Sequence, residues 1–205
     1  MEETKIVYID DDLQEDDPII VLLKEKYGDQ NVIVKRKSTE GLRVVLELLP
    51  SKVIVLLDLD LGHGQPSGAK VFEEIRNETS LVYVIFVTAK QFDSIPAEDL
   101  IHFINNDALA IVNNTEDLQV ILDLVDKAYH RLDTRIDCIL EQWIAKRPRA
   151  EQEQPYLMTK GGNTYTLKDV MNEIRKETDL GKRLKKGILQ LAIEMLTNDS
   201  EKIDD

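Results

Sequence analysis

The feature that most constrains the fold is a series of short apolar segments in the first 115 residues. These segments are rich in Val and Ile and are mostly unbroken, rather than alternating apolar with polar residues. Such segments are typical of strands that are covered on both faces, as in a parallel sheet. The segments are Ile6–Ile9, Val32–Val34, Val53–Leu57, Leu81–Val87 and Leu109–Val112.

Helix-like segments separate the apolar segments, and this alternation predicts the fold class. Five strands interleaved with helices predict a doubly wound α/β domain over residues 1–130. The sequence has no internal repeat and no low-complexity tract that would favour another architecture. The helix-like segments lie near Pro18–Tyr27, Glu40–Leu49, Gly68–Arg76 and Pro96–Ile104.

The chain is acidic, with 26 Lys and Arg residues against 39 Asp and Glu residues and a formal net charge of −13. The excess negative charge lies in residues 1–115, whereas residues 156–205 carry equal numbers of acidic and basic side chains. This balance disfavours binding to phosphate backbones over the whole surface. We therefore do not expect nucleic acid as a partner.

Composition also bears on the cellular compartment. No apolar run reaches the roughly 18 residues that a membrane-spanning helix needs, and the first residues do not resemble a secretory signal. The one cysteine, Cys138, excludes an internal disulfide and a cysteine-based zinc cluster. We therefore expect a cytoplasmic protein without a membrane partner.

Acidic residues follow two of the predicted strands. Asp10 and Asp11 come after the first strand, and Asp58 comes after the third. In an open parallel sheet of order 2-1-3-4-5, the ligand crevice lies at the carboxyl ends of these two strands. Carboxylates that converge there repel each other unless a cation compensates, and Mg²⁺ prefers such oxygen ligands. An aspartate neutralised by a metal can act as a nucleophile toward a phosphoryl group.

Three sequence segments together resemble the receiver domain of two-component response regulators. The resemblance covers roughly residues 4–130 and implies a flavodoxin-like, doubly wound, five-stranded parallel sheet of order 2-1-3-4-5. It also implies a phosphodonor, either a sensor kinase or a phosphotransfer protein. The segments are Ile6–Asp12, Leu56–Leu61 and Phe86–Ala89.

The resemblance assigns a role to each residue of the expected site. It implies that Asp58 is the phospho-accepting aspartate. It implies that Asp11, Asp58 and the backbone carbonyl of Asp60 hold Mg²⁺, with Asp10 in the same acidic pocket. Thr88 would supply the hydroxyl that moves toward the phosphoryl group.

The sequence departs from the receiver pattern after the fifth strand. Receivers carry a lysine followed by a proline there, whereas this chain has Asn113 and Asn114, with Ala110 at the position of the aromatic switch residue. An amide donates a hydrogen bond but carries no charge, so it cannot fully replace a lysine. Lys90, two residues after Thr88, is the alternative source of positive charge. These departures put the coupling of phosphorylation to an output surface in question.

A long helix is predicted over residues 115–147, which contain neither Pro nor Gly before Arg147-Pro148. Its apolar residues recur at steps of four and three, a spacing that keeps one seam facing a partner helix, as in a coiled coil. We expect a homodimer through the far half of this helix, and folding back against the C-terminal helices is the alternative. The seam is Leu118, Leu122, Val125, Tyr129, Leu132, Ile136, Ile139 and Trp143.

The C-terminal residues predict a second, smaller module. Residues 148–160 are predicted to be a polar linker, residues 161–197 a small all-α module and residues 198–205 a frayed tail. Thr166 with Asp169 resembles a capping box at the start of a helix. We interpret the basic residues of 182–186 as a solvated helix face, because the module as a whole is neutral.

These observations together predict a non-enzymatic signalling protein that acts through its long helix and C-terminal helices on an unknown output protein. Three alternatives remain open. The chain could be a phosphorylation-independent pseudo-receiver scaffold. It could be a Mg²⁺-dependent phosphohydrolase, since Asp58-Leu59-Asp60 resembles the paired aspartates of haloacid dehalogenase-like phosphatases. It could also be a regulator that binds DNA through its C-terminal helices.

Overall fold

The computed structural model divides into two compact units, Met1–Arg135 and Ile136–Asp205, which we call unit 1 and unit 2. Each unit is described by itself. No helix in the described part of the chain combines the length and the hydrophobicity that crossing a membrane requires. The described residues are 4–49, 51–79, 82–106, 108–132, 136–159, 161–175 and 178–198.

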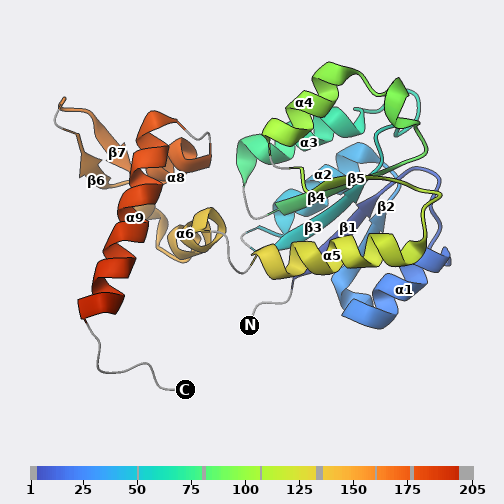
Figure 1. The fold of residues 1–205 in the computed structure, drawn as a ribbon, viewed down its shortest axis with the longest axis horizontal. Helices are drawn as coiled ribbons and strands as arrows, with labels where there is room; N and C mark the ends of the chain where they lie inside the picture. Colours follow the sequence, from blue (N-terminus) through green and yellow to red (C-terminus); the bar gives the residue numbers. More distant parts are fainter. Residues whose placement is uncertain are drawn as a thin grey trace. The chain divides into compact units, whose positions relative to one another are not determined.

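Unit 1 contains a five-stranded sheet of order β2-β1-β3-β4-β5, in which all neighbouring strands run parallel (Figure 1). This is the doubly wound topology that the sequence predicted. Every residue of β3 and β4 is buried, and all of them except Thr88 are apolar, as expected for strands covered on both faces. The strands are β1 Lys5–Ile9, β2 Val32–Lys35, β3 Val53–Leu57, β4 Val82–Thr88 and β5 Ala110–Asn113.

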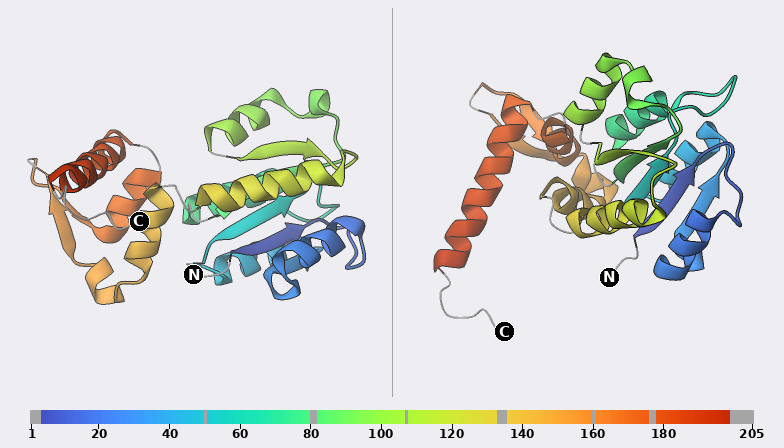
Figure 2. Two further views of the ribbon diagram at one scale, coloured as in Figure 1. Left: turned by 60° about the horizontal axis from the view of Figure 1, so that its bottom comes forward. Right: turned by 45° about the vertical axis from the view of Figure 1, so that its right-hand side comes forward.

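Helices cover both faces of this sheet. Helices α2, α3 and α4 lie on one face and α1 and α5 on the other (Figures 1 and 2). The α2–α4 side forms a core in which Phe72 and Phe103 from the helices pack around Phe86 of β4. The helices are α1 Pro18–Tyr27, α2 Ser38–Glu47, α3 Gly68–Glu78, α4 Ala97–Asn105 and α5 Leu118–Leu132, with short 3-10 turns η1 Asp29–Asn31 and η2 Phe92–Ser94.

The two halves of the predicted 115–147 helix are both helical. Helix α5 occupies the near half, with Leu122, Val125 and Leu132 buried in unit 1. Helix α6, Ile136–Ala145, occupies the far half. Residues 133–135 lie outside the described residues, so one continuous helix stays a prediction.

Unit 2 is not the all-α module that the sequence predicted. It begins at α6, and the predicted linker 148–160 forms a short helix, α7, and a strand, β6. Strand β6 pairs antiparallel with β7, and the turn between them contains Gly162 with a φ of 86°. The aromatic and β-branched residues that flank this turn favour strands, and this signal was missed. The remaining elements are α7 Arg149–Gln152, β6 Pro155–Met158, β7 Thr164–Thr166, α8 Leu167–Arg175 and α9 Asp179–Asn198.

The far half of the predicted seam only partly behaves as expected. Within unit 2, Leu140 and Ile144 of α6 pack against the core formed by α8, so α6 folds against the C-terminal helices. These two residues lie beside the predicted seam rather than on it. The seam residues Ile139 and Trp143 are 51% and 41% exposed. Helix α6 is apolar on two adjacent stripes, and the periodicity alone could not show which one the core would use.

Candidate metal centre

The pairing of β1 with β3 positions the acidic residues of unit 1. Ile9 and Leu57 are partners in the parallel register, and the backbone N–H of Asp58 donates to the carbonyl of Ile9 at 3.0 Å. Asp10 and Asp58 therefore leave neighbouring strands at the same level, with Asp11 one residue further on. The topology predicted this convergence, because β1 and β3 are adjacent at the point where strand order reverses.

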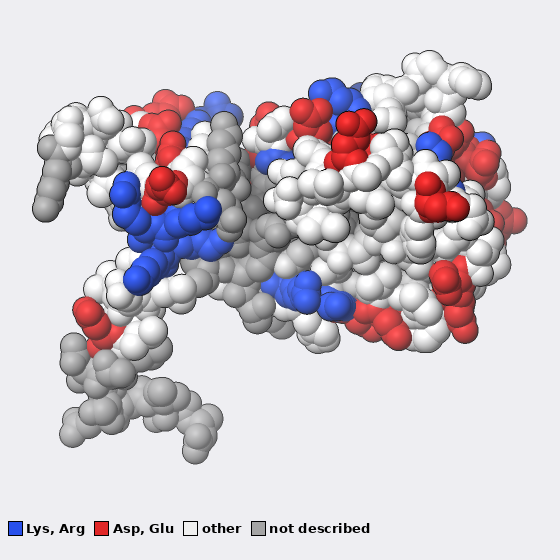
Figure 3. All heavy atoms as spheres, turned by 45° about the horizontal axis from the view of Figure 1, so that its top comes forward, with Lys and Arg blue, Asp and Glu red and all other residues white. Residues whose placement is uncertain are grey.

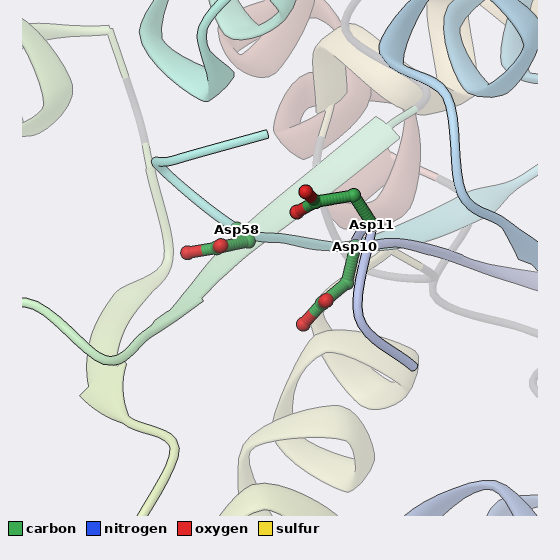
Figure 4. Close-up of side chains that lie close together, drawn as sticks. All are labelled: Asp10, Asp11 and Asp58. Carbon is green, nitrogen blue, oxygen red and sulfur yellow. The ribbon is translucent and has the colours of Figure 1, made fainter. Parts of the chain in front are cut away.

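The carboxylates of Asp10, Asp11 and Asp58 form a close cluster. One oxygen from each lies within 4.8 Å of the others, and Figure 4 shows the three side chains at the ends of β1 and β3. All three residues are partly buried. Three carboxylates at this separation cannot all stay ionised without a compensating cation.

Burial changes the titration of two of these carboxyls. Burial raises the pKa of Asp58 above its usual range, and hydrogen bonds from Thr88 and from the backbone at residues 59 and 60 oppose this shift. Burial also raises the pKa of Asp10, assisted by the nearby charge of Asp58. Among the described residues, the Oδ1 atom of Asp58 is buried and has no hydrogen-bond partner. A buried carboxylate oxygen without a partner is costly unless a cation binds it.

The donor set fits a hard divalent cation. Mg²⁺ binds through one or two carboxylates, keeps several waters and leaves positions for phosphate oxygens. The chain also leaves room for the carboxylate of Asp11. A Cβ atom on Gly62 would lie 2.7 Å from the Oδ2 atom of Asp11, and Gly62 has a φ of 76° that favours glycine.

Thr88 lies beside Asp58 at the end of β4. It is 1% exposed, and its side chain forms one of the hydrogen bonds to Asp58. Its Oγ1 atom also accepts a hydrogen bond from the backbone N–H of Lys90 at 3.2 Å. The threonine predicted from the sequence therefore contacts the central carboxylate of the cluster.

The side chain of Asp60 is not part of the cluster. It is exposed and pairs with Lys90, whose Nζ atom lies 3.5 Å from its Oδ2 atom. The expected metal ligand at this position is the backbone carbonyl, so that role stays a prediction. Lys90 brings a positive charge to the rim of the site, next to Asp60.

Asn113, at the expected lysine position, is engaged in the turn after β5. It pairs in register with Thr88, and its amide donates to the carbonyl of Lys90 at 3.4 Å. Its side-chain oxygen accepts from the backbone N–H of Thr115 at 3.0 Å and from the Thr115 hydroxyl at 2.6 Å. Both ends of the amide therefore hold the turn together.

Comparisons with known proteins identify the fold. No protein-family model matches the sequence, and no curated protein matches it. Solved structures do match. An N-terminal domain of a response regulator/sensory box/GGDEF protein from Carboxydothermus hydrogenoformans is 20% identical with a TM-score of 0.51, covering 63% of this chain and 97% of that one. Unit 1 has the receiver-domain fold.

Two further receiver domains agree. One, from Clostridium thermocellum, is 24% identical with a TM-score of 0.50, covering 64% of this chain and 98% of that one. The other, from Methanospirillum hungatei, is 21% identical with a TM-score of 0.50, covering 64% and 94%. At this level of sequence identity, the similarity to these domains concerns the fold of unit 1.

Sequence reasoning missed residues that shape the receiver unit around the cluster. The Gln65 side chain accepts a hydrogen bond from the backbone N–H of Ser38 at 2.8 Å and so ties the long loop to α2. A Cβ atom on Gly68 would lie 2.1 Å from the carbonyl oxygen of Asp58, so α3 starts directly against the backbone of Asp58. Ser67 caps α3 through the backbone N–H of Lys70. A Ser-Gly pair before a helix was the signal available for this contact.

Proposed function

We propose that the chain is an atypical response-regulator receiver protein that accepts a phosphoryl group on Asp58 with Mg²⁺. The observation that carries this proposal is the buried Oδ1 atom of Asp58, which has no described partner and lies within a cluster of three carboxylates. In this proposal Asp10, Asp11 and Asp58 and the backbone carbonyl of Asp60 hold the ion. The proposal thus adds the phosphoryl transfer of response-regulator receivers to the fold that unit 1 shares with them.

The chemistry requires little covalent machinery from the protein. An oxygen of the Asp58 carboxylate attacks the donor's phosphorus, the bond from phosphorus to the donor's leaving group breaks, and the leaving group keeps that electron pair. When bound, Mg²⁺ offsets the charge on the phosphoryl oxygens. Thr88, already hydrogen-bonded to Asp58, supplies a hydroxyl beside the transferred group. Asp10 and Asp11 orient the ion.

The missing lysine sets this site apart. Asn113 offers no charge and holds its own turn, while Lys90 lies at Asp60 on the rim. The phosphoryl group therefore loses one charge-assisted contact. This feature favours a second candidate, a pseudo-receiver scaffold that signals without phosphorylation.

The proposed partners follow from the same reasoning. A sensor kinase or phosphotransfer protein would supply the phosphoryl group, and an output protein would respond to the state of the receiver unit through unit 2. We propose that this occurs in the cytoplasm, without a membrane or nucleic-acid partner, and that the chain is a homodimer. Its role would be non-enzymatic, because the phosphoryl group stays on the protein.

Phosphorylation is tested by incubating the full chain with Mg²⁺ and a small phosphodonor and locating the modification by mass spectrometry. We expect a phosphoryl adduct on Asp58 that is lost in D58N. The matched control D60N removes an exposed carboxylate outside the cluster and should still be modified. An unmodified wild-type chain would favour the scaffold. Steady release of phosphate from phosphate esters, lost in D58N, would favour a phosphohydrolase.

A further inference from the structure

Unit 2 exposes an unusually apolar surface. Side chains from α6, β6 and α9 contribute to it, and they are 38% to 71% exposed. Four of these side chains, Ile139, Trp143, Tyr156 and Ile188, lie together around one groove, and clustered exposed apolar side chains mark interaction sites in natural proteins. The exposed side chains are Ile139, Trp143, Tyr156, Met158, Ile188, Leu189, Leu191, Ile193 and Met195.

An apolar groove of about 420 Å³ lies within this surface. Its walls come from α6, β6, α8 and the first half of α9, so it is formed entirely by unit 2. Ile139 and Trp143 of the predicted seam line it, together with Tyr156 and Ile188. Grooves of this composition accept the apolar face of a helix.

Helix α9 extends well past the elements that it packs on. It has 20 residues, or about 30 Å, whereas α8 has nine. Figures 1 and 2 show its second half running beyond α8 and the β6–β7 hairpin. One stripe at steps of four and three runs along it through Leu184, Ile188, Leu191 and Met195. Leu184 and Ile188 line the groove, while Leu191 and Met195 are 59% and 61% exposed.

We propose that this surface binds a second copy of the chain, with the second half of each α9 lying against the groove of the other copy. The chain carries both complementary parts, an apolar groove and an exposed apolar helix that continues the same stripe. In a dimer with a two-fold axis, the α9 of each copy covers the groove of the other, so both grooves and both helices are buried.

Charge distribution along α9 supports a second copy as the occupant. Within α9, residues 179–187 contain four basic side chains and one acidic one, whereas residues 188–198 contain one acidic side chain, Glu194, and no basic one. Figure 3 shows the basic cluster over the first turns of α9. An antiparallel arrangement of two copies places the basic first half of each α9 beside the second half of its partner's α9, which carries Glu194 and no basic side chain. A parallel arrangement would bring like charges together.

This interface refines the homodimer expected from residues 115–147. The α6 residues Leu140 and Ile144 pack in the core of their own unit and form the floor of the groove, so the exposed part of α6 at the interface is Ile139 and Trp143. The main contact shifts to α9, outside the segment that the sequence predicts to self-associate. The inference does not depend on any chemistry at Asp58.

Sedimentation velocity of the full chain at micromolar concentration, without Mg²⁺ or phosphodonor, tests the interface. We expect the wild-type chain to sediment at twice its mass of 23.5 kDa. L191E and I139E each place a charge on one side of the interface and should raise the dimer dissociation constant by about 30-fold or more. The control Q190E adds the same charge to α9 off the apolar stripe and should remain dimeric.

Circular dichroism checks that the variants keep their fold, which we expect because Leu191 and Ile139 are more than half exposed. A wild-type chain that is monomeric under these conditions would overturn the proposal. The apolar surface would then bind unit 1 or another protein instead of a second copy. Dimers that persist in both L191E and I139E would place the contact elsewhere. Dissociation of L191E alone would show that α9 binds outside the groove.

Discussion

Asp58 is the proposed phosphoryl acceptor, and the ionisation of its carboxyl is also expected to affect the stability of unit 1. It is partly buried beside two other carboxylates, and burial raises its pKa. Because the pKa of Asp58 is higher in the folded than in the unfolded state, protonation of Asp58 stabilises the fold. This stabilisation is fully present below the unfolded-state pKa near 3.8, and it is lost as the pH rises through the folded-state pKa. The folded receiver unit without a cation is therefore expected to be less stable at neutral than at mildly acidic pH.

We predict that D58N makes the free energy of unfolding in EDTA less dependent on pH. At neutral pH the variant should be more stable than the wild-type chain by roughly 1 kcal/mol, because one of three clustered charges is gone. Added Mg²⁺ should stabilise the wild-type chain and leave D58N nearly unchanged. Urea unfolding at several pH values, with and without Mg²⁺, measures both effects. D60N serves as the control, and an equal response to Mg²⁺ in D58N would contradict the assigned site.

Asn113 gives a second prediction at the residue scale. N113K removes the amide that bonds to Thr115 and Lys90, so it should lower the free energy of unfolding by about 1 kcal/mol. If Asp58 is phosphorylated, the new ammonium group should lengthen the lifetime of the phosphoryl group by roughly ten-fold through a charge-assisted contact. Loss of the label over time measures this, with N114K as the control. A shorter lifetime in N113K would show that the amide itself protects the group.

At the scale of elements, two glycines of the same helix have opposite surroundings. A Cβ atom on Gly181 would lie 2.0 Å from the backbone carbonyl oxygen of Glu173, so α9 begins in close contact with the end of α8. A Cβ atom on Gly187 would meet nothing within 4 Å. Glycine is therefore required at the first position and costs helix stability at the second.

We predict that G181A lowers the free energy of unfolding of unit 2 by about 1–3 kcal/mol, because the backbone must shift. In contrast, G187A should raise it by about 0.5–1 kcal/mol, the helix-propensity difference between Gly and Ala. Trp143 is the one tryptophan of the chain and lies in unit 2, so its fluorescence during denaturation reports on this unit. Equal effects of the two variants would contradict the close helix contact.

Elements also show where sequence reasoning succeeds. The unbroken apolar segments predicted β3 and β4 because both strands are buried on both faces, and the strand order then brought Asp10, Asp11 and Asp58 together. The capping box was visible because its partners are three residues apart; the Thr166 N–H donates to Asp169 at 2.9 Å.

Tertiary contacts explain most of what the sequence missed. The sequence does not predict the hairpin β6–β7, because its strands are only four and three residues long and mostly exposed, so they carry little hydrophobic pattern. Nothing local distinguishes the stripe of Leu140 and Ile144 from that of Ile139 and Trp143. Only the packing of α8 selects between them. The bond of Asn113 to Lys90 joins positions 23 residues apart and was equally invisible.

At the scale of the whole molecule, the chain consists of two compact units with separate cores. The acidic cluster belongs to unit 1 and the single tryptophan to unit 2. We predict that Mg²⁺ shifts the unfolding transition seen by far-ultraviolet circular dichroism, which is dominated by the larger unit. The Trp143 fluorescence transition should stay in place. A Mg²⁺-induced shift of the Trp143 transition would show that the two units unfold as one.

The turn held by Asn113 has a consequence for how information could leave the receiver unit. The loop after β4 is tethered twice, through the backbone N–H of Lys90 to Thr88 and through its carbonyl to Asn113. A rotation of the Thr88 side chain away from Lys90 would break the first tether and leave the second. Because Asn113 also bonds to Thr115, a displacement of the loop after β4 would reach the turn that leads from β5 to α5.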